Sequence, residues 1–379
     1  MKREAETLND SQGLAGRPWV NTTHQKAFKK RIRVHTESRN LVLLGFALLL
    51  LISFFVNVSI GAVQIGLGEL WEILLMQVGL NSESVSVTKE NVFFAIRLPR
   101  TLLGILVGGT LGISGALMQA LFRNPLADPG LLGISSGAAA GASLIIVLGA
   151  GIGVTAFSSV WALPMAAFLG ALLTTVVVWR LGTRSGRSDV TTMLLAGIAI
   201  NALAGSVTGL MVLVSNDSQL RSLTFWSLGS LNGSLWSYVW IVGFCFCLMV
   251  AAIPFLGRPL NALLLGEHDA LCLGVRVEVY KKFIIVITSV CVGAAVAFTG
   301  MIGFIGLVAP HMVRLMVGPD HSKVLPGSVL LGAILLLNSD LIARTLVPPT
   351  EIPIGIVTAL IGAPYFLWLL KRTQLRRIF

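Results

Sequence analysis

Ten long runs of apolar residues follow residue 40, and they limit the possible fold more than any other feature of the sequence. A helix needs about 20 mostly apolar residues to cross the hydrocarbon core of a bilayer. We therefore predict an all-α, polytopic membrane protein with about ten transmembrane helices, contained in a transmembrane domain over residues 41–379. The runs cover roughly residues 41–62, 98–121, 130–150, 157–180, 190–214, 236–256, 282–300, 303–317, 327–346 and 354–370.

The composition excludes a soluble fold. Charged residues make up only 12% of the chain, whereas soluble domains carry about 25%. Glycine is frequent, with 40 residues, and several glycines recur every four residues, a spacing that lets two membrane helices approach closely. Helices with this spacing either line a pathway or serve packing alone. The glycines concerned are Gly104, Gly108 and Gly112, then Gly133, Gly137 and Gly141, and then Gly205 and Gly209.

The placement of basic residues predicts the orientation. Residues 1–40 are polar, with nine Lys/Arg against four Asp/Glu, and we interpret them as a disordered cytoplasmic tail before an uncleaved first span. With the N-terminus inside, the inner segments hold 23 of the 28 Lys/Arg and the outer segments five. Basic residues are concentrated on the cytoplasmic side of membrane proteins. We therefore predict cytoplasmic N- and C-termini, and the net charge of +11 needs no nucleic-acid partner.

Three connections are too long to be simple loops. Residues 63–97 contain an amphipathic stretch near Leu70–Val78 that predicts a short interfacial helix. Residues 215–235 carry aromatic residues that suit the membrane boundary or a short helix. The inner segment Gly257–Lys282 reads as two short helices joined by a polar turn at Gly266–Asp269. It is either a surface for another protein or an ordinary amphipathic connector.

A weak internal repeat occurs at an offset of 185 residues. Val107-Gly108 matches Val292-Gly293, Ser114-Gly115 matches Thr299-Gly300, and Pro125 matches Pro310. The repeat relates the second span to the seventh, which run in opposite directions. It is either chance composition or an inverted internal repeat, a feature of transport folds.

No motif in the chain predicts catalysis. No G-x-x-x-x-G-K-[ST] loop occurs, so ATP hydrolysis by this chain is not expected. The four cysteines form no CxxC pair and are interpreted as free thiols. A metal-ligand role for His311 with His321 is weaker than capping or solvation, so we predict no metal site and no cofactor. Asp340 is the single acidic candidate within the spans, which speaks against a secondary transporter driven by an ion gradient.

The segment Arg97-Leu-Pro-Arg100 places two arginines on the predicted outer side, which is otherwise poor in basic charge. The guanidinium fork of arginine binds carboxylates in a bidentate manner. The two side chains therefore either dock an acidic partner surface or extend to lipid headgroups. The residues alone leave both interpretations open.

Several stretches together resemble the FecCD-type permease family, the membrane subunits of ABC importers for ferric siderophores, haem and vitamin B12. The resemblance covers nearly the whole chain after residue 60. It implies a homodimer around a central pathway, two ATPase subunits that hold ATP and Mg, a periplasmic binding protein, and location in the bacterial inner membrane. The stretches are Arg97–Arg100, Ser114–Gln119, Arg123–Ile134, Leu194–Gly197, Gly303–Arg314 and Pro353–Pro364.

The resemblance also implies roles for individual residues. It assigns binding-protein docking to Arg97, Arg100 and Arg344. It assigns ATPase coupling to the Gly257–Lys282 segment, with Leu263, Leu264, Gly266, Glu267, His268, Leu273 and Gly274. It assigns the cytoplasmic gate region to Asn124 and Leu126, and more loosely to Thr191 and Thr192.

Within the family, Val317–His321 and Ser339–Val347 look most like haem permeases. The resemblance therefore implies the permease subunit of an ATP-driven importer that moves an iron chelate, haem in preference, from the periplasm to the cytoplasm. A ferric siderophore or vitamin B12 is the alternative cargo. The apolar spans hold no paired His, Tyr or Met placed to ligate haem iron, so the iron ligands are expected on the binding protein.

Overall fold

The computed structural model describes residues 22–61, 63, 65–77, 86–149, 151 and 156–378. The chain divides into two units, Met1–Val42 and Leu43–Phe379, and helix α1 runs across the boundary. Apart from one short hairpin, the regular structure in the described part is helical. The elements are α1 Thr22–Ser59, α2 Leu67–Gln77, α3 Val87–Asn91, η2 Val92–Arg97, α4 Leu98–Leu121, η3 Pro129–Leu132, α5 Ile134–Leu148, α6 Ala156–Leu181, β1 Thr183–Arg184, β2 Arg187–Ser188, α7 Val190–Val214, α8 Asp217–Ser227, α9 Trp236–Leu263, α10 Glu267–Cys272, α11 Val277–Thr299, α12 Ile305–Val317, α13 His321–Thr345 and α14 Ile354–Ile378.

The predicted all-α, polytopic architecture is confirmed. Among the described residues, seven helices are long and apolar enough to cross a membrane. Three shorter apolar helices accompany them, Ile134–Leu148, Ile305–Val317 and Ile354–Trp368. Each predicted apolar run corresponds to one of these helices. The predicted division near Gly300–Gly303 is also correct, because α11 ends at Thr299 and α12 begins at Ile305.

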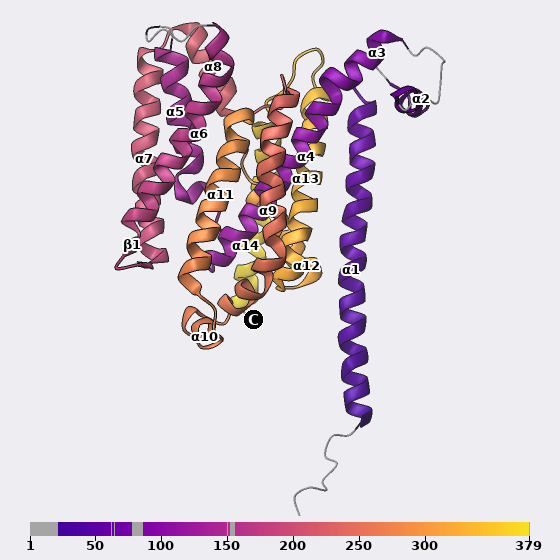
Figure 1. The fold of residues 1–379 in the computed structure, drawn as a ribbon, viewed down its shortest axis with the longest axis vertical. Coiled ribbons are helices and arrows are strands. Elements are labelled where there is room, and N and C mark those ends of the chain that lie inside the picture. The colour runs from indigo at the N-terminus through magenta and orange to yellow at the C-terminus, as the bar shows by residue number, and fades with distance from the viewer. Residues whose placement is uncertain are drawn as a thin grey trace, which may run out of the picture. The chain divides into compact units, whose positions relative to one another are not determined.

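Within residues 43–379, helix α4 is the centre of the packing (Figure 1). It contacts α9, α11, α12 and α13, and nearly all of its residues from Pro99 to Leu121 are buried. Helices α5, α6 and α7 pack against one another beside it, and α11 contacts both groups. Since α7 is exposed along much of its length, it forms one flank of the described chain.

Close glycine contacts explain the packing of α4 and α5. A Cβ atom on Gly108 would lie 2.5 Å from the carbonyl oxygen of Gly332 in α13, and one on Gly137 would lie 2.4 Å from the carbonyl oxygen of Gly170 in α6. Only residues without a side chain allow backbones to meet at this distance. The same expectation for Gly205 and Gly209 is wrong within this chain, because nothing lies within 4 Å of a Cβ at either position. Both glycines lie on α7, where none of the helices described for this chain covers them.

The connections lie at two opposite ends of the bundle (Figure 1). Helices α2, α3 and α8 lie at one end, and α10 and the β1–β2 hairpin lie at the other, with the C-terminus. These are the segments predicted to be outer and inner, respectively, so the two ends are called the outer and inner end below. Helix α2 confirms a short helix in the predicted stretch, and its Leu70 and Ile73 pack against Val58 at the end of α1. Its position at the membrane interface remains a prediction.

The structure bears on two further predicted segments, the inner connection and the N-terminal tail. Gly257–Leu263 continues α9 instead of forming a short helix of its own, because Leu260 and Leu263 are buried and hold the backbone in the bundle. Of the predicted tail, residues 1–21 lie outside the described residues, and α1 begins within it at Thr22. The disorder of the tail and the inverted repeat remain predictions.

Candidate functional site

Two of the predicted docking arginines cap the end of α1. The last turn of a helix leaves four carbonyl groups without partners inside the helix. Arg97 Nη1 donates to the carbonyl oxygens of Val58 and Ser59, at 2.5 and 2.6 Å, and Arg97 Nη2 donates to that of Val63. Because a cation is favourable at the negative end of a helix, Arg97 stabilises the position where α1 ends.

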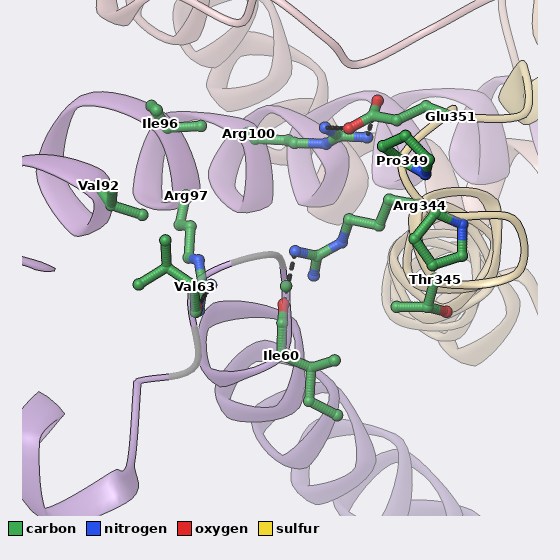
Figure 2. A pocket seen from close by; sticks show the side chains of 12 residues that line it. Ile60, Val63, Val92, Ile96, Arg97, Arg100, Arg344, Thr345, Pro349 and Glu351 are labelled. Atoms are coloured by element: carbon green, nitrogen blue, oxygen red, sulfur yellow. Dashed lines mark hydrogen bonds and ion pairs between the residues drawn. The ribbon is translucent and has the colours of Figure 1, made fainter.

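Arg344 completes this cap from α13. Its Nη2 donates to the carbonyl oxygen of Asn57 at 2.5 Å, and its Nη1 donates to that of Ile60 at 2.7 Å. Figure 2 shows the bond to Ile60 and the approach of Arg97 to Val63. The terminal carbonyl groups of α1 are thus bonded by two guanidinium groups from two other helices, which joins α1 to η2 and α13.

Arg100 forms an ion-pair cluster with two carboxylates at this end. Its Nε lies 3.1 Å from both carboxylate oxygens of Asp340, and its Nη2 lies 2.8 Å from Oδ1 of the same residue. Its Nη1 and Nη2 also donate to the two carboxylate oxygens of Glu351, at 2.9 and 3.0 Å (Figure 2). The Asp340 side chain is only 2% exposed. Arg100 therefore ties the start of α4 to α13 and to the connection before α14.

These residues surround a cavity of about 460 Å³ at the outer end. Three arginines and Glu351 line this cavity. Asp340 is bonded to Arg100, one of the lining arginines. The structure thus brings the three predicted docking residues together, but their guanidinium groups already bond groups of the same chain. Docking by these side chains remains a prediction. Sequence reasoning missed Asp340 and Glu351 as their partners, although a lone acidic residue in a span could have indicated a buried ion pair.

The predicted coupling residues surround α10 at the inner end. Gly266 and Gly274, which flank this helix, have φ angles of +129° and +81°, which residues with a side chain rarely adopt. Leu263 is buried, whereas Leu264 and Leu273 are 47% and 64% exposed. Leu265 and Leu271 are also exposed, at 66% and 58%. Four exposed leucines around one short helix form an apolar surface, which is typical of a protein interaction site.

The two polar members of the coupling set differ in their contacts. The His268 side chain is 91% exposed and lies 3.9 Å from Asp269. Glu267 instead pairs with Lys281 at 2.7 Å and with Arg123 at 3.5 Å. Glu267 therefore fastens α10 to the bundle, whereas His268 points away from it.

The predicted gate residues lie at the same end as α10, in two short segments. Asn124 Oδ1 accepts a bond from the Leu126 amide at 2.9 Å, which shapes the loop after α4. Asp189 caps the start of α7 and accepts bonds from the amide and hydroxyl of Thr192. These bonds hold the pKa of Asp189 below its usual range. Thr191 and Thr192 are exposed on the first turn of α7, and the gate role of all four residues remains a prediction.

The histidines that sequence reasoning considered as metal ligands have different surroundings. His321 is buried, and its amide and its Nδ1 lie 2.8 and 3.0 Å from Oδ1 of Asn261, which joins the start of α13 to α9. His311 packs edge-on against Tyr365 of α14. Among the described residues, no group of three or more His, Cys, Asp or Glu side chains is arranged to hold a metal ion.

The fold and the two ends define a class: a multi-pass helical membrane protein with an ordered cap at one end and a short helix surrounded by exposed leucines at the other. Comparison with known proteins gives the family. The model of the FecCD transport family matches residues 49–372. The chain therefore belongs to this family, and it is the permease subunit of an ABC importer, a transport subunit and not a catalytic one.

Several relatives have known names. The chain is 42% identical over 338 residues to the hemin transport system permease protein HmuU of Yersinia pestis, covering 89% of this chain and 97% of the relative. It is 40% identical over 338 residues to the vitamin B12 import system permease protein BtuC of Klebsiella pneumoniae, covering 88% and 94%. A solved structure, described as an inward-facing conformation of a proposed metal-chelate type ABC transporter, aligns with a TM-score of 0.76 at 31% identity, covering 88% and 99%. Permeases of this kind work with ATPase and substrate-binding partners.

Proposed function

We propose that this chain carries an iron chelate, most specifically haem, from the periplasm to the cytoplasm of a bacterium. The observation that supports haem is the similarity to a hemin permease along 97% of that relative. The stretches Val317–His321 and Ser339–Val347 are also those most like haem permeases. Vitamin B12 is the second candidate, because its permeases are nearly as similar, and a ferric siderophore is the third.

The mechanism that fits this chain is alternating access driven by partner subunits. Nucleotide binding brings two ATPase subunits together, and α10 passes their movement to the spans. The exposed leucines around α10 support this role, since the apolar surface that they form is stabilised when a partner protein covers it. A second copy of the chain completes the pathway, and both termini lie in the cytoplasm.

The cargo is held weakly within the spans. His321 has its amide and Nδ1 directed at Asn261, so it is a structural residue of the helix junction. Asp340 is bonded to Arg100, which makes it unsuitable as the free carboxylate that an ion-driven carrier uses. Recognition of the iron chelate is therefore assigned to the binding protein.

Reconstitution tests this function. The permease, its ATPase and its binding protein are placed in vesicles, and uptake of haem, vitamin B12 and a ferric siderophore is measured with ATP or a non-hydrolysable analogue. We expect haem uptake that requires ATP hydrolysis and persists when an ionophore collapses the ion gradients. Uptake without ATP would reject the ABC mechanism, and ATP-dependent uptake of vitamin B12 but not haem would reject the assigned cargo.

The ATPase-binding role of α10 has its own test. Leu265→Ser and Leu271→Ser are expected to weaken binding of the ATPase subunits to the purified permease. The matched control is Leu346→Ser, because Leu346 is 65% exposed but lies at the outer end. Equal ATPase affinity for all three variants would contradict docking on α10.

A further inference from the structure

A buried lysine connects α10 to two other segments at the inner end. Lys281, in the second turn of α11, is 2% exposed. Its Nζ donates to Glu267 Oε2 at 2.7 Å, to the carbonyl oxygen of Ser188 at 2.9 Å and to Glu278 Oε1 at 3.1 Å. A lysine ammonium group has three donors, so these partners from α10, β2 and α11 satisfy it completely.

The two carboxylates extend the connection. The second oxygen of Glu267, Oε1, lies 3.5 Å from Arg123 Nη2, in the loop after α4. The second oxygen of Glu278, Oε2, accepts a bond from the amide of Ser188 at 2.9 Å. The cluster of Lys281, Glu267, Glu278, Ser188 and Arg123 therefore contains two cations and two anions. Its charge is balanced.

The cluster lies where a movement of α10 would change its ion pairs. Glu267 is the first residue of α10, directly after Gly266 with its φ of +129°. The ion pairs that the structure shows between α10 and other elements all start from Glu267. Arg123 precedes Asn124 in the loop after α4, and Ser188 precedes the Asp189 cap of α7 by one residue. Any shift of α10 must therefore stretch bonds to both segments.

We propose that the Glu267–Lys281 pair is a positioning joint that transmits movement of α10 both to the loop after α4 and to the start of α7. This inference rests on the proposed ATP-driven function. The joint works because Lys281 is buried: a buried ammonium group cannot exchange a lost carboxylate for water without a large cost. Glu267 and Lys281 therefore move as one unit, and Ser188 and Arg123 follow them.

The test separates transmission of movement from simple stability. The complete complex of permease, ATPase and binding protein is reconstituted with Lys281→Met, Lys281→Arg or Glu267→Gln. Arg180→Met is the matched control, because Arg180 is an exposed basic residue in the last turn of α6 and belongs neither to the cluster nor to the Gly257–Lys282 segment. Cargo uptake and ATP hydrolysis are measured in the same vesicles, and the readout is uptake per ATP hydrolysed.

We expect Lys281→Met and Glu267→Gln to lower uptake per ATP by roughly fivefold or more, the lower range for coupling between two sites, while hydrolysis continues. Lys281→Arg is expected to restore part of the loss, and Arg180→Met to match the unmodified protein. The proposal would be overturned if uptake per ATP hydrolysed were unchanged in Glu267→Gln, whether uptake and hydrolysis both stay the same or both fall equally. If Lys281→Met fails to assemble, Glu267→Gln still tests the proposal, because it changes only one partly exposed carboxylate group.

A second readout does not depend on the cargo. A reporter cysteine, Thr191→Cys, is placed in a chain that carries Cys247→Ser and Cys272→Ser, since both native cysteines are exposed. Its reaction with a water-soluble thiol reagent is timed with and without vanadate-trapped nucleotide. We expect the nucleotide effect to disappear in Glu267→Gln and to persist in Arg180→Met, and the reverse would overturn the proposal. If the protein without these cluster changes shows neither ATP-driven uptake nor a nucleotide effect, the proposed function itself fails.

Discussion

Replacement of Arg100 by leucine distinguishes a structural role from a docking role at the outer end. The change leaves the Asp340 carboxylate, 2% exposed, with Arg344 Nε at 3.6 Å as its nearest ion-pair partner. Removing one member of a buried ion pair costs about 3–5 kcal/mol, because the remaining charge is left in a poorly solvated site. Glu351 adds little, since its side chain is 35% exposed and regains water. We therefore expect the free energy of unfolding to fall by about 3–5 kcal/mol.

The assay is thermal unfolding of the purified permease in detergent, followed by affinity for the binding protein at a temperature where the variant is folded. Arg221→Leu is the control, because Arg221 is an exposed arginine on α8 at the same end. It should melt like the unmodified protein. The double variant Arg100→Leu with Asp340→Leu should regain part of the stability, since no unpaired carboxylate remains at Asp340.

One result would refute the buried ion-pair reasoning. If Arg100→Leu melts at the temperature of the unmodified protein and only its affinity for the binding protein falls, the Arg100 guanidinium is available to a partner. Docking would then be the main role of this residue. If instead stability falls and affinity of the folded fraction is unchanged, the cluster holds α4 to α13 and the docking assignment is rejected.

Three further changes test other parts of the structure. Gly112→Ala places a Cβ 2.1 Å from the carbonyl oxygen of Ser328 and should lower the free energy of unfolding by about 1–3 kcal/mol through overpacking. Gly205→Ala is its control, because a Cβ there meets nothing within 4 Å. Equal melting temperatures for the two variants would contradict this packing. Burial raises the pKa of Asp128 above the usual value for an aspartate, so its stabilising contribution is complete below that usual pKa and is lost as the pH rises through the raised pKa. Asp128→Asn should therefore flatten the dependence of melting temperature on pH, and an unchanged slope would contradict the assignment. Arg97→Ala removes the guanidinium donors to the carbonyl groups of Val58, Ser59 and Val63, while Arg344 still bonds those of Asn57 and Ile60. The change should cost about 1–3 kcal/mol per buried group left unpaired, measured by thermal unfolding; Arg221→Leu serves again as the control, and equal stability would show that water replaces the cap.

Much of the fold could be predicted because the bilayer imposes it. A span needs a fixed length of apolar residues, so the apolar runs predicted the helices, and the glycines near Gly300 predicted the turn between α11 and α12. The glycine spacing predicted close contacts for Gly108 and Gly137 but could not tell that Gly205 faces no helix in the described part of its own chain. Spacing shows which residues share a helix face, whereas the neighbour of that face depends on how distant segments assemble.

The sequence by itself determined the class of protein: its apolar runs require a membrane, and its motifs identify the permease family. The tertiary structure decided the roles of the charged residues. Arg100 and Asp340 are 240 positions apart, and Lys281 and Ser188 are 93 apart, so no local pattern could pair them. The physical reason is that a charge taken out of water needs a specific partner, and the three-dimensional fold decides which partner lies within reach. The outer arginines, for which the residues alone left docking and lipid contact open, form caps and ion pairs within the chain, and docking by them remains a prediction.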